Sequence, residues 1–139
     1  MAAAKAFIDS NVILYLLSTD TKKAEAAEAI LLTGGLISVQ VLNEIANVAV
    51  RKLGMSWTEI NQFLAPLRSL CTVEPLTVET HDRGREVAER YGLSVYDSMI
   101  VAAALLAECT VLHSEDMQDG LLVDKQLRIA NPFESAAVR

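Results

Sequence analysis

Short apolar stretches alternate with longer helical stretches along the chain, and this alternation most constrains the fold. Five stretches have the length and composition of buried strands: Lys5–Asp9, Leu36–Ser38, Cys71–Glu74, Thr110–His113 and Leu127–Ile129. Helical patterns begin at Asn11 and recur over Thr21–Leu32, Val39–Leu53, about Ser56–Ser69, Thr77–Tyr91 and Val95–Ala107. This order predicts an α/β fold, with three α/β/α layers around a central, mainly parallel sheet of about five strands.

Two of the predicted helices have unusual sequences. Pro66 falls late in the helix that follows Ser56, so we expect a kink or an early end there. The helix over Val95–Ala107 is apolar on nearly every side, so we expect it to be buried over most of its surface.

Length, charge and cysteine content limit the class of protein. The 139 residues contain no repeat or linker, which predicts a single domain over residues 1–139. The formal net charge of -6 argues against a nonspecific nucleic-acid coat protein, because Lys and Arg supply affinity for phosphates. Cys71 and Cys109 are far apart in sequence, and we expect buried, reduced thiols. Polar residues interrupt the apolar N-terminal run, so we expect a cytoplasmic protein without membrane insertion.

Four acidic residues lie near points where a strand ends or a helix begins. Asp9 and Asp116 follow the first and fourth strands, on the sheet edge where open parallel sheets bind ligands. Glu44 lies on the helix after the second strand, and Asp97 opens the most apolar helix. If the fold brings these carboxylates together, they repel one another by several kcal/mol at an effective dielectric of about 20. A hard divalent cation such as Mg²⁺ or Mn²⁺ relieves that repulsion, which predicts a metal centre suited to phosphoryl chemistry.

Each of these acids also has a purely structural interpretation. Asp9 could cap the helix that follows it, although Ser10 and Asn11 are equally good caps. Asp97 could be the capping-box partner of Ser94. Glu44 shares a helical face with other polar residues and could belong to a solvated stripe. The metal-site hypothesis therefore depends on the four acids converging.

Several neighbouring residues could supply the fourth acid. After the fourth strand come Ser114, Glu115 and Asp116, and Asp119 follows in a turn. We interpret Asp116 as the ligand and Ser114 as a hydroxyl that orients a water or a carboxylate. Glu115 and Asp119 remain alternatives.

Several segments taken together resemble a PIN-domain protein, most nearly the VapC-type toxins. They are FIDSNVILYLL, SVQVLNEIANVAVRK, LSVYDSMIVAAALLAECTVLHSEDMQDG and IANPF, and the resemblance covers nearly the whole chain. It implies a compact α/β/α fold, an endoribonuclease activity that uses Mg²⁺ or Mn²⁺ on an RNA substrate, and inhibition by a cognate antitoxin protein.

The resemblance also implies roles for individual residues. The family's acidic positions correspond to Asp9, Glu44, Asp97 and Asp116, of which the last is the most variable in the family. Ser114 falls where the family has Thr or Ser, and Asn11 matches the polar residue two positions after the first acid. One or two metal ions would be held by these acids, directly or through waters.

Other functions share part of this pattern. A DNA or structure-specific nuclease would use the same acids, but the chain lacks an obvious helical clamp and a basic surface. A non-catalytic PIN-fold binding module would keep the fold without the chemistry. The apolar fraction of 52% suggests extra hydrophobic surface, which fits a homodimer, an antitoxin contact, or both. Candidates to guide RNA are Arg51, Lys52, Arg83, Arg85 and Arg128.

Overall fold

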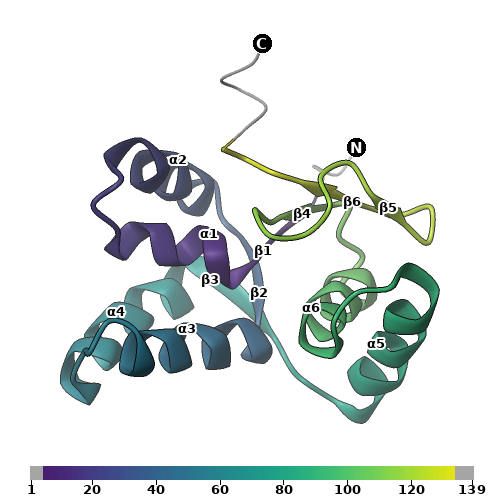
Figure 1. Ribbon diagram of the computed structural model, residues 1–139, viewed down its shortest axis with the longest axis horizontal. Coiled ribbons are helices and arrows are strands. Elements are labelled where there is room, and N and C mark those ends of the chain that lie inside the picture. The colour runs from purple at the N-terminus through teal and green to yellow at the C-terminus, as the bar shows by residue number, and fades with distance from the viewer. Residues whose placement is uncertain (1–4, 134–139) are drawn as a thin grey trace.

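In a computed structural model, which describes residues 5–133, the chain forms a six-stranded sheet with helices on both faces (Figure 1). The strands are β1 (Ala6–Ile8), β2 (Gly35–Ser38), β3 (Cys71–Glu74), β4 (Val111–His113), β5 (Leu122–Val123) and β6 (Leu127–Ala130). Their order is β3-β2-β1-β4-β6-β5, and each neighbouring pair is parallel except β5 with β6. The predicted α/β class and mainly parallel sheet are confirmed.

The helices also follow the predicted order. They are α1 (Ser10–Leu14), α2 (Thr21–Leu32), α3 (Val39–Arg51), α4 (Trp57–Leu70), α5 (Val78–Tyr91) and α6 (Val95–Leu106), and a short 3-10 helix, η1 (Tyr15–Leu17), extends α1. The strand β5 was not predicted, because two residues beside a turn are too few to show a periodic pattern. Within residues 5–133, none of the helices combines the length and the apolar character needed to cross a membrane.

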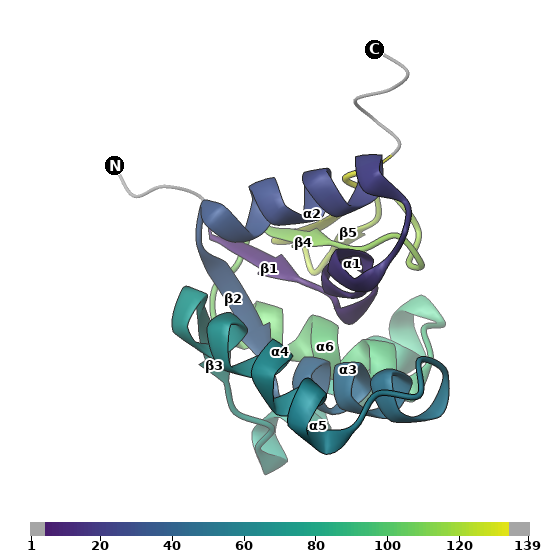
Figure 2. The same cartoon turned by 90° about the vertical axis from the view of Figure 1, so that its left-hand side faces the viewer.

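The helices form two layers around the sheet. Turned by 90°, the structure shows α2 above the sheet and α3, α5 and α6 below it (Figure 2). In the first view, α1 to α4 gather at one end of the molecule, and α5 and α6 lie beneath β4, β5 and β6 at the other (Figure 1).

The pairing of β1 with β4 brings two distant segments to one edge of the sheet. Ile8 lies opposite His113 in the parallel register, so the next residues, Asp9 and Ser114, leave the sheet side by side. The backbone confirms this, because the Asp9 N–H donates to the His113 carbonyl at 3.0 Å. The carboxyl ends of the two central strands thus form the predicted edge.

Helix α6 anchors the lower layer. All eight residues from Ser98 to Leu105 are buried, which confirms the expectation from its apolar sequence. It packs most extensively against α5, where Gly84 faces Met99 and Ser98. A Cβ at Gly84 would lie 2.8 Å from the end of the Met99 side chain and 3.3 Å from the Ser98 carbonyl oxygen, so a larger residue here would require Met99 to move.

Pro66 does not end its helix early. Helix α4 continues through it to Leu70, held to the core by the buried side chains of Ile60 and Leu67. The ring removes one backbone donor, but Pro66 and Gln62, four residues earlier, are both exposed, so water can satisfy the freed carbonyl. The alternative of an early end is therefore wrong.

Candidate functional site

Asp9 is a buried carboxylate at the point where β1 passes into α1. Only 2% of the residue is exposed. Its Oδ1 accepts the Ser10 backbone N–H at 2.7 Å, so Asp9 does cap α1. Its Oδ2 accepts the Ser114 hydroxyl at 2.8 Å and the Asn11 side-chain amide at 3.0 Å. Capping thus uses one oxygen, while two side chains from different elements orient the other.

Glu44 reaches the same site from α3 through a hydroxyl group. The Ser10 Oγ donates to Glu44 Oε1 at 2.7 Å and lies 3.4 Å from Asp9 Oδ1, so one serine touches both acids. The Gln40 amide donates to Glu44 Oε2 at 3.3 Å. Since Gln40 is buried and Glu44 half-buried, Glu44 does not belong to a solvated stripe.

Asn11 and Ser114 tie the turn after β4 to α1. The Asn11 amide lies 3.4 Å from Ser114 Oγ, and its Oδ1 accepts the Glu115 backbone N–H at 3.0 Å. Ser114 is fully buried and its hydroxyl also accepts the Met117 backbone N–H at 3.3 Å. Both residues named as supporting from the sequence therefore contact Asp9 and each other.

Asp97 is half-buried in the first turn of α6. Its backbone N–H donates to the Ser94 hydroxyl at 3.2 Å, so Ser94 caps the helix as predicted. The reciprocal bond of a capping box, from the Ser94 backbone to the Asp97 carboxylate, does not occur in residues 5–133. Burial raises the pKa of Asp97, a side-chain hydrogen bond with Ser94 opposes that rise, and the charge of Asp116 raises the pKa further.

The three acids that follow β4 have different environments. Glu115 accepts the Tyr15 hydroxyl and forms an ion pair with Lys23 at 2.6 Å. Asp119 accepts the Asn131 backbone N–H at 2.8 Å and so fixes a turn. Asp116 is exposed, and in residues 5–133 it takes part in no hydrogen bond or ion pair. Of these three acids, Asp116 is therefore the one whose carboxylate has no partner in residues 5–133.

The charges of the acids affect one another's pKa values. Burial raises the pKa of Asp9 to about 7, against the opposing effect of the Ser114 and Ser10 hydrogen bonds, and the charges of Glu44 and Asp97 raise it further. Within residues 5–133, Asp9 forms no ion pair with a Lys or Arg. The charge of Asp116 in turn raises the pKa of Asp97. Pairwise charge effects therefore link Glu44 and Asp97 to Asp9, and Asp116 to Asp97.

The donor set fits a hard divalent cation. Carboxylate oxygens are the ligands that Mg²⁺ and Mn²⁺ prefer, and a bound cation would supply the positive counter-charge for Asp9. In the described part of the chain, however, no three His, Cys, Asp or Glu side chains stand close enough to hold a metal ion by themselves. Mg²⁺ in proteins often keeps several waters and is held by only one or two carboxylates.

Three contributors were missed from the sequence. Ser10 was considered only as a cap, yet its hydroxyl links Asp9 to Glu44. Tyr15 and Lys23 hold Glu115 from about a hundred positions away in sequence. No local pattern marks such pairs, because they depend on how α2 lies beside the turn after β4.

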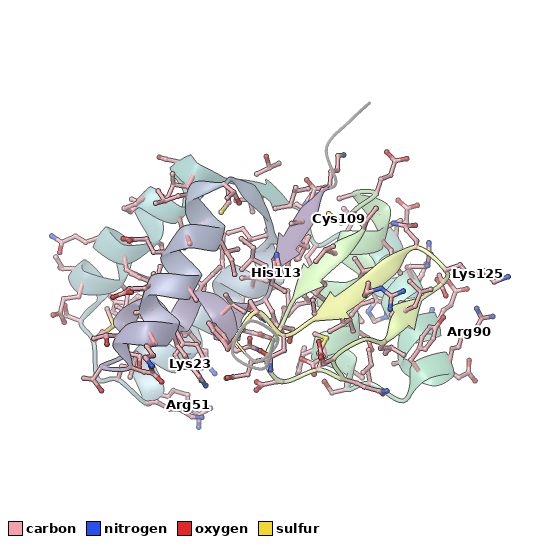
Figure 3. The ribbon with its side chains drawn as sticks, turned by 90° about the horizontal axis from the view of Figure 1, so that it is seen from above. Lys23, Arg51, Arg90, Cys109, His113 and Lys125 are labelled. Carbon is pink, nitrogen blue, oxygen red and sulfur yellow. The ribbon has the colours of Figure 1, made fainter. Side chains whose placement is uncertain are left out.

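Most of the candidate RNA-guiding residues are already engaged. Arg83 binds Asp124 at 2.8 Å, Arg85 binds Asp82 at 3.0 Å, and Arg128 donates to the Gly120 carbonyl at 3.1 Å. Seen from above, Lys23 and Arg51 lie at one end of the molecule, and Arg90 and Lys125 lie at the other (Figure 3).

Solved structures similar to this chain come from toxin–antitoxin systems. A toxin–antitoxin complex from Klebsiella pneumoniae aligns with a TM-score of 0.71 at 20% identity, covering 94% of this chain and 99% of that one. The sarcin-ricin loop cleaving toxin VapC20 of Mycobacterium tuberculosis aligns with a TM-score of 0.67 at 17% identity, covering 81% and 90%. FitAcB from Neisseria gonorrhoeae gives 0.64 at 15% identity, covering 93% and 99%.

At these identities the solved structures support the fold alone, and a search of curated proteins finds no significant match. The family comparison is more decisive, because the PIN domain matches residues 6–119. That span runs from the start of β1 beyond Asp116 and contains all four acids. PIN domains are typically metal-dependent nucleases. Because the match takes in most of the sequence, this chain belongs to the PIN-domain family.

Proposed function

We propose that this protein is a metal-dependent endoribonuclease and the toxin of a toxin–antitoxin pair. The observation that carries the proposal is the Asp9 carboxylate, which is 2% exposed, has a pKa raised to about 7 and feels the charges of Glu44 and Asp97. An unpaired buried charge destabilises a fold, so a purely structural acid would be paired with a cation. Perturbed carboxylates of this kind mark functional sites.

Asp9 and Asp97 would hold the metal, with Glu44 and Asp116 acting directly or through waters. When bound, the ion would supply an activated water and stabilise the charge that develops on a phosphodiester. The chain's own residues prepare this arrangement. Ser114 and Asn11 orient one oxygen of Asp9, and Ser10 fixes Glu44 relative to the other.

RNA is the proposed substrate, and an antitoxin protein the proposed inhibitor. A similar structure is described as a sarcin-ricin loop cleaving toxin, and others are described as toxin–antitoxin complexes or as complexes bound to DNA. The acidic site favours an inhibitor that inserts a basic side chain beside Asp9 and Asp97, because opposite charges are attracted most strongly where both are desolvated. Arg51 and Lys52, which form no ion pair in residues 5–133, are the remaining cations to guide RNA.

We also propose that the protein forms a homodimer. Large apolar side chains are exposed where α3 passes into α4, at Val50, Leu53 and Trp57, and Trp57 is 63% exposed. Several exposed large apolar side chains in one short segment favour a protein contact there. Sedimentation at micromolar concentration should give a dimer, and the Trp57→Ser variant a weaker one. A wild-type protein that stays monomeric would exclude this contact.

The nuclease proposal is tested with labelled RNA and a DNA of matched sequence, each incubated with Mg²⁺, Mn²⁺ or EDTA. We expect metal-dependent cleavage of RNA that is lost in Asp97→Asn and kept in Asp82→Asn, a control acid that lies exposed on α5. Cleavage that survives Asp97→Asn would contradict the site assignment, and preferential cleavage of DNA would contradict the substrate. A protein that binds metal but cleaves neither polymer would be a binding module.

A further inference from the structure

A pocket of about 280 Å³ adjoins the acidic site on the side of η1. It is lined by Asn11, Leu14, Tyr15, Ser18, Glu115 and Asp116. Its walls are mainly apolar, unlike the acids next to it. This volume is at the low end of ligand pockets, so it suits a single ring system better than a larger ligand.

The pocket and the acidic site share a residue. Asn11 lines the pocket, and its side-chain amide also donates to Asp9 at 3.0 Å. A phosphodiester near Asp9 carries one nucleoside on each side, and the pocket lies one side chain away from that position. A nucleobase attached to the reacting phosphate would therefore be within reach of Leu14 and Tyr15.

The charges of the pocket exclude a phosphate group. Glu115 and Asp116 contribute two carboxylates, and Lys23 already binds Glu115 at 2.6 Å. An anion would meet unbalanced negative charge, whereas a neutral aromatic ring would not. Apolar walls beside a polar edge are the usual environment of a flipped-out base.

The hydrogen-bonding groups of the pocket are mainly acceptors. The Asn11 amide protons are committed to Asp9 and Ser114, while the carboxylate oxygens of Glu115 and Asp116 retain free lone pairs. A ligand that complements them must donate hydrogen bonds from its edge. Cytosine and adenine do so through an exocyclic amino group, whereas uracil presents a carbonyl oxygen at the corresponding position.

We propose that this pocket binds an amino-bearing nucleobase of the substrate and that Glu115 reads the amino group. The inference rests on the proposed nuclease function for its biological meaning, but base binding itself needs neither metal nor cleavage. In this proposal Leu14 and Tyr15 form the walls of the pocket. The pocket would then give the enzyme a preference for certain bases beside the cleaved phosphodiester.

The test is a titration of the full-length chain in EDTA with cytidine and, separately, uridine, up to their solubility limits, followed by amide chemical shifts. We expect cytidine to shift the amides of residues 14–18 and 115–116, and uridine to bind about tenfold more weakly, as expected for one lost donor–acceptor match. Equal affinity for the two nucleosides, shifts located elsewhere, or no shift with either would overturn the proposal.

Two variants make the test specific. Ser18→Phe places a ring in the pocket from an exposed position and should abolish cytidine binding, whereas Ser69→Phe, at an exposed position on α4, should not. Equal thermal stability of both variants would show that folding is unaffected, and cytidine binding that survives Ser18→Phe would overturn the pocket assignment.

The outcome is separable from that of the nuclease proposal. Asp97→Asn should bind cytidine like the wild type even though it cleaves no RNA. Cytidine binding without any RNA cleavage would support the base-binding proposal and reject the nuclease proposal. RNA cleavage without cytidine binding would support the nuclease proposal and reject the base-binding proposal.

Discussion

The hydroxyl of Ser10 joins two acids that lie 35 positions apart in the sequence, because it donates to Glu44 at 2.7 Å and lies 3.4 Å from Asp9. The contact crosses from α1 to α3, and Ser10 is 7% exposed. Because one serine contacts both carboxylates, it fixes the distance between them. A metal ion bound there would not have to impose that distance by itself. Ser10 is therefore a positioning residue of the proposed site.

Ser10→Ala should lower the rate of RNA cleavage about tenfold, the value of one hydrogen bond to a charged group. Folding stability should change by less than about 1 kcal/mol, because Glu44 is half-buried and water can replace the lost donor. Single-turnover cleavage and urea unfolding measure the two effects. Ser69→Ala, at an exposed serine on α4, is the control, and equal cleavage rates for both variants would reject the positioning role.

Asp9 should make folding stability depend on pH. Its pKa is about 7 in the folded chain, where burial raises it, against 3.8 for an ordinary aspartate. Between these values the folded state keeps a proton that the unfolded state has lost, so stability in EDTA should fall as the pH rises from about 4 to about 7. The full penalty, on the order of a few kcal/mol, should be present above about pH 7.

Urea unfolding in EDTA at about pH 5 and about pH 8 measures this dependence. The slope should be flatter in Asp9→Asn, which cannot ionise at this position. Mg²⁺ or Mn²⁺ should restore stability to the wild type at the higher pH and have little effect on Asp9→Asn. Parallel slopes for the two proteins would mean that Asp9 does not titrate in this range.

The sequence predicted the elements well because each long helix and strand carries its own periodic pattern. Helices α2 and α5 end at the predicted residues, and the Ser56–Glu59 capping box is present. The same patterns placed Asp9 and Asp116 on one edge, since parallel strands share a direction. The tertiary contacts were not predictable in this way. No local sequence pattern indicates that Lys23 contacts Glu115, and Ser10 has the same sequence context as an ordinary helix cap.

Lys125→Gly should stabilise the fold by about 0.5 to 1 kcal/mol. Asp124 and Lys125 open the three-residue turn between β5 and β6, and both have positive φ, 51° and 57°. Asp124 is held by Arg83 and by the Tyr91 hydroxyl at 2.9 Å, whereas Lys125 is exposed at the far end of the molecule from Lys23 (Figure 3).

Thermal and urea unfolding measure the change at Lys125. The matched control is Lys52→Gly, at a lysine with φ of -104° at the end of α3, where glycine should lower stability because it only adds freedom to the unfolded chain. If both variants lose stability, the strain at Lys125 is not significant.

Lys23→Met should weaken RNA binding more than catalysis. Burial raises the pKa of Glu115, but hydrogen bonds from Lys23 and Tyr15 outweigh it, so the pKa is lowered and the carboxylate is held ionised. Removing the ammonium leaves Glu115 without its counter-charge beside Asp116, which makes the site more repulsive to phosphates. We expect a higher KM and a nearly unchanged kcat.

Two controls separate this effect from a general loss of positive charge. Lys22→Met removes the same charge from the same helix at an exposed position, away from the pair with Glu115, and Lys23→Arg keeps a cation opposite Glu115. Both should retain a KM close to that of the wild type. Because screening by salt weakens exposed charges more than half-buried ones, the gap between the Lys23 and Lys22 variants should persist as salt is raised, even as both KM values rise. An equal rise in KM for both Met variants would mean that only net charge matters and that the pairing of Lys23 with Glu115 has no special role.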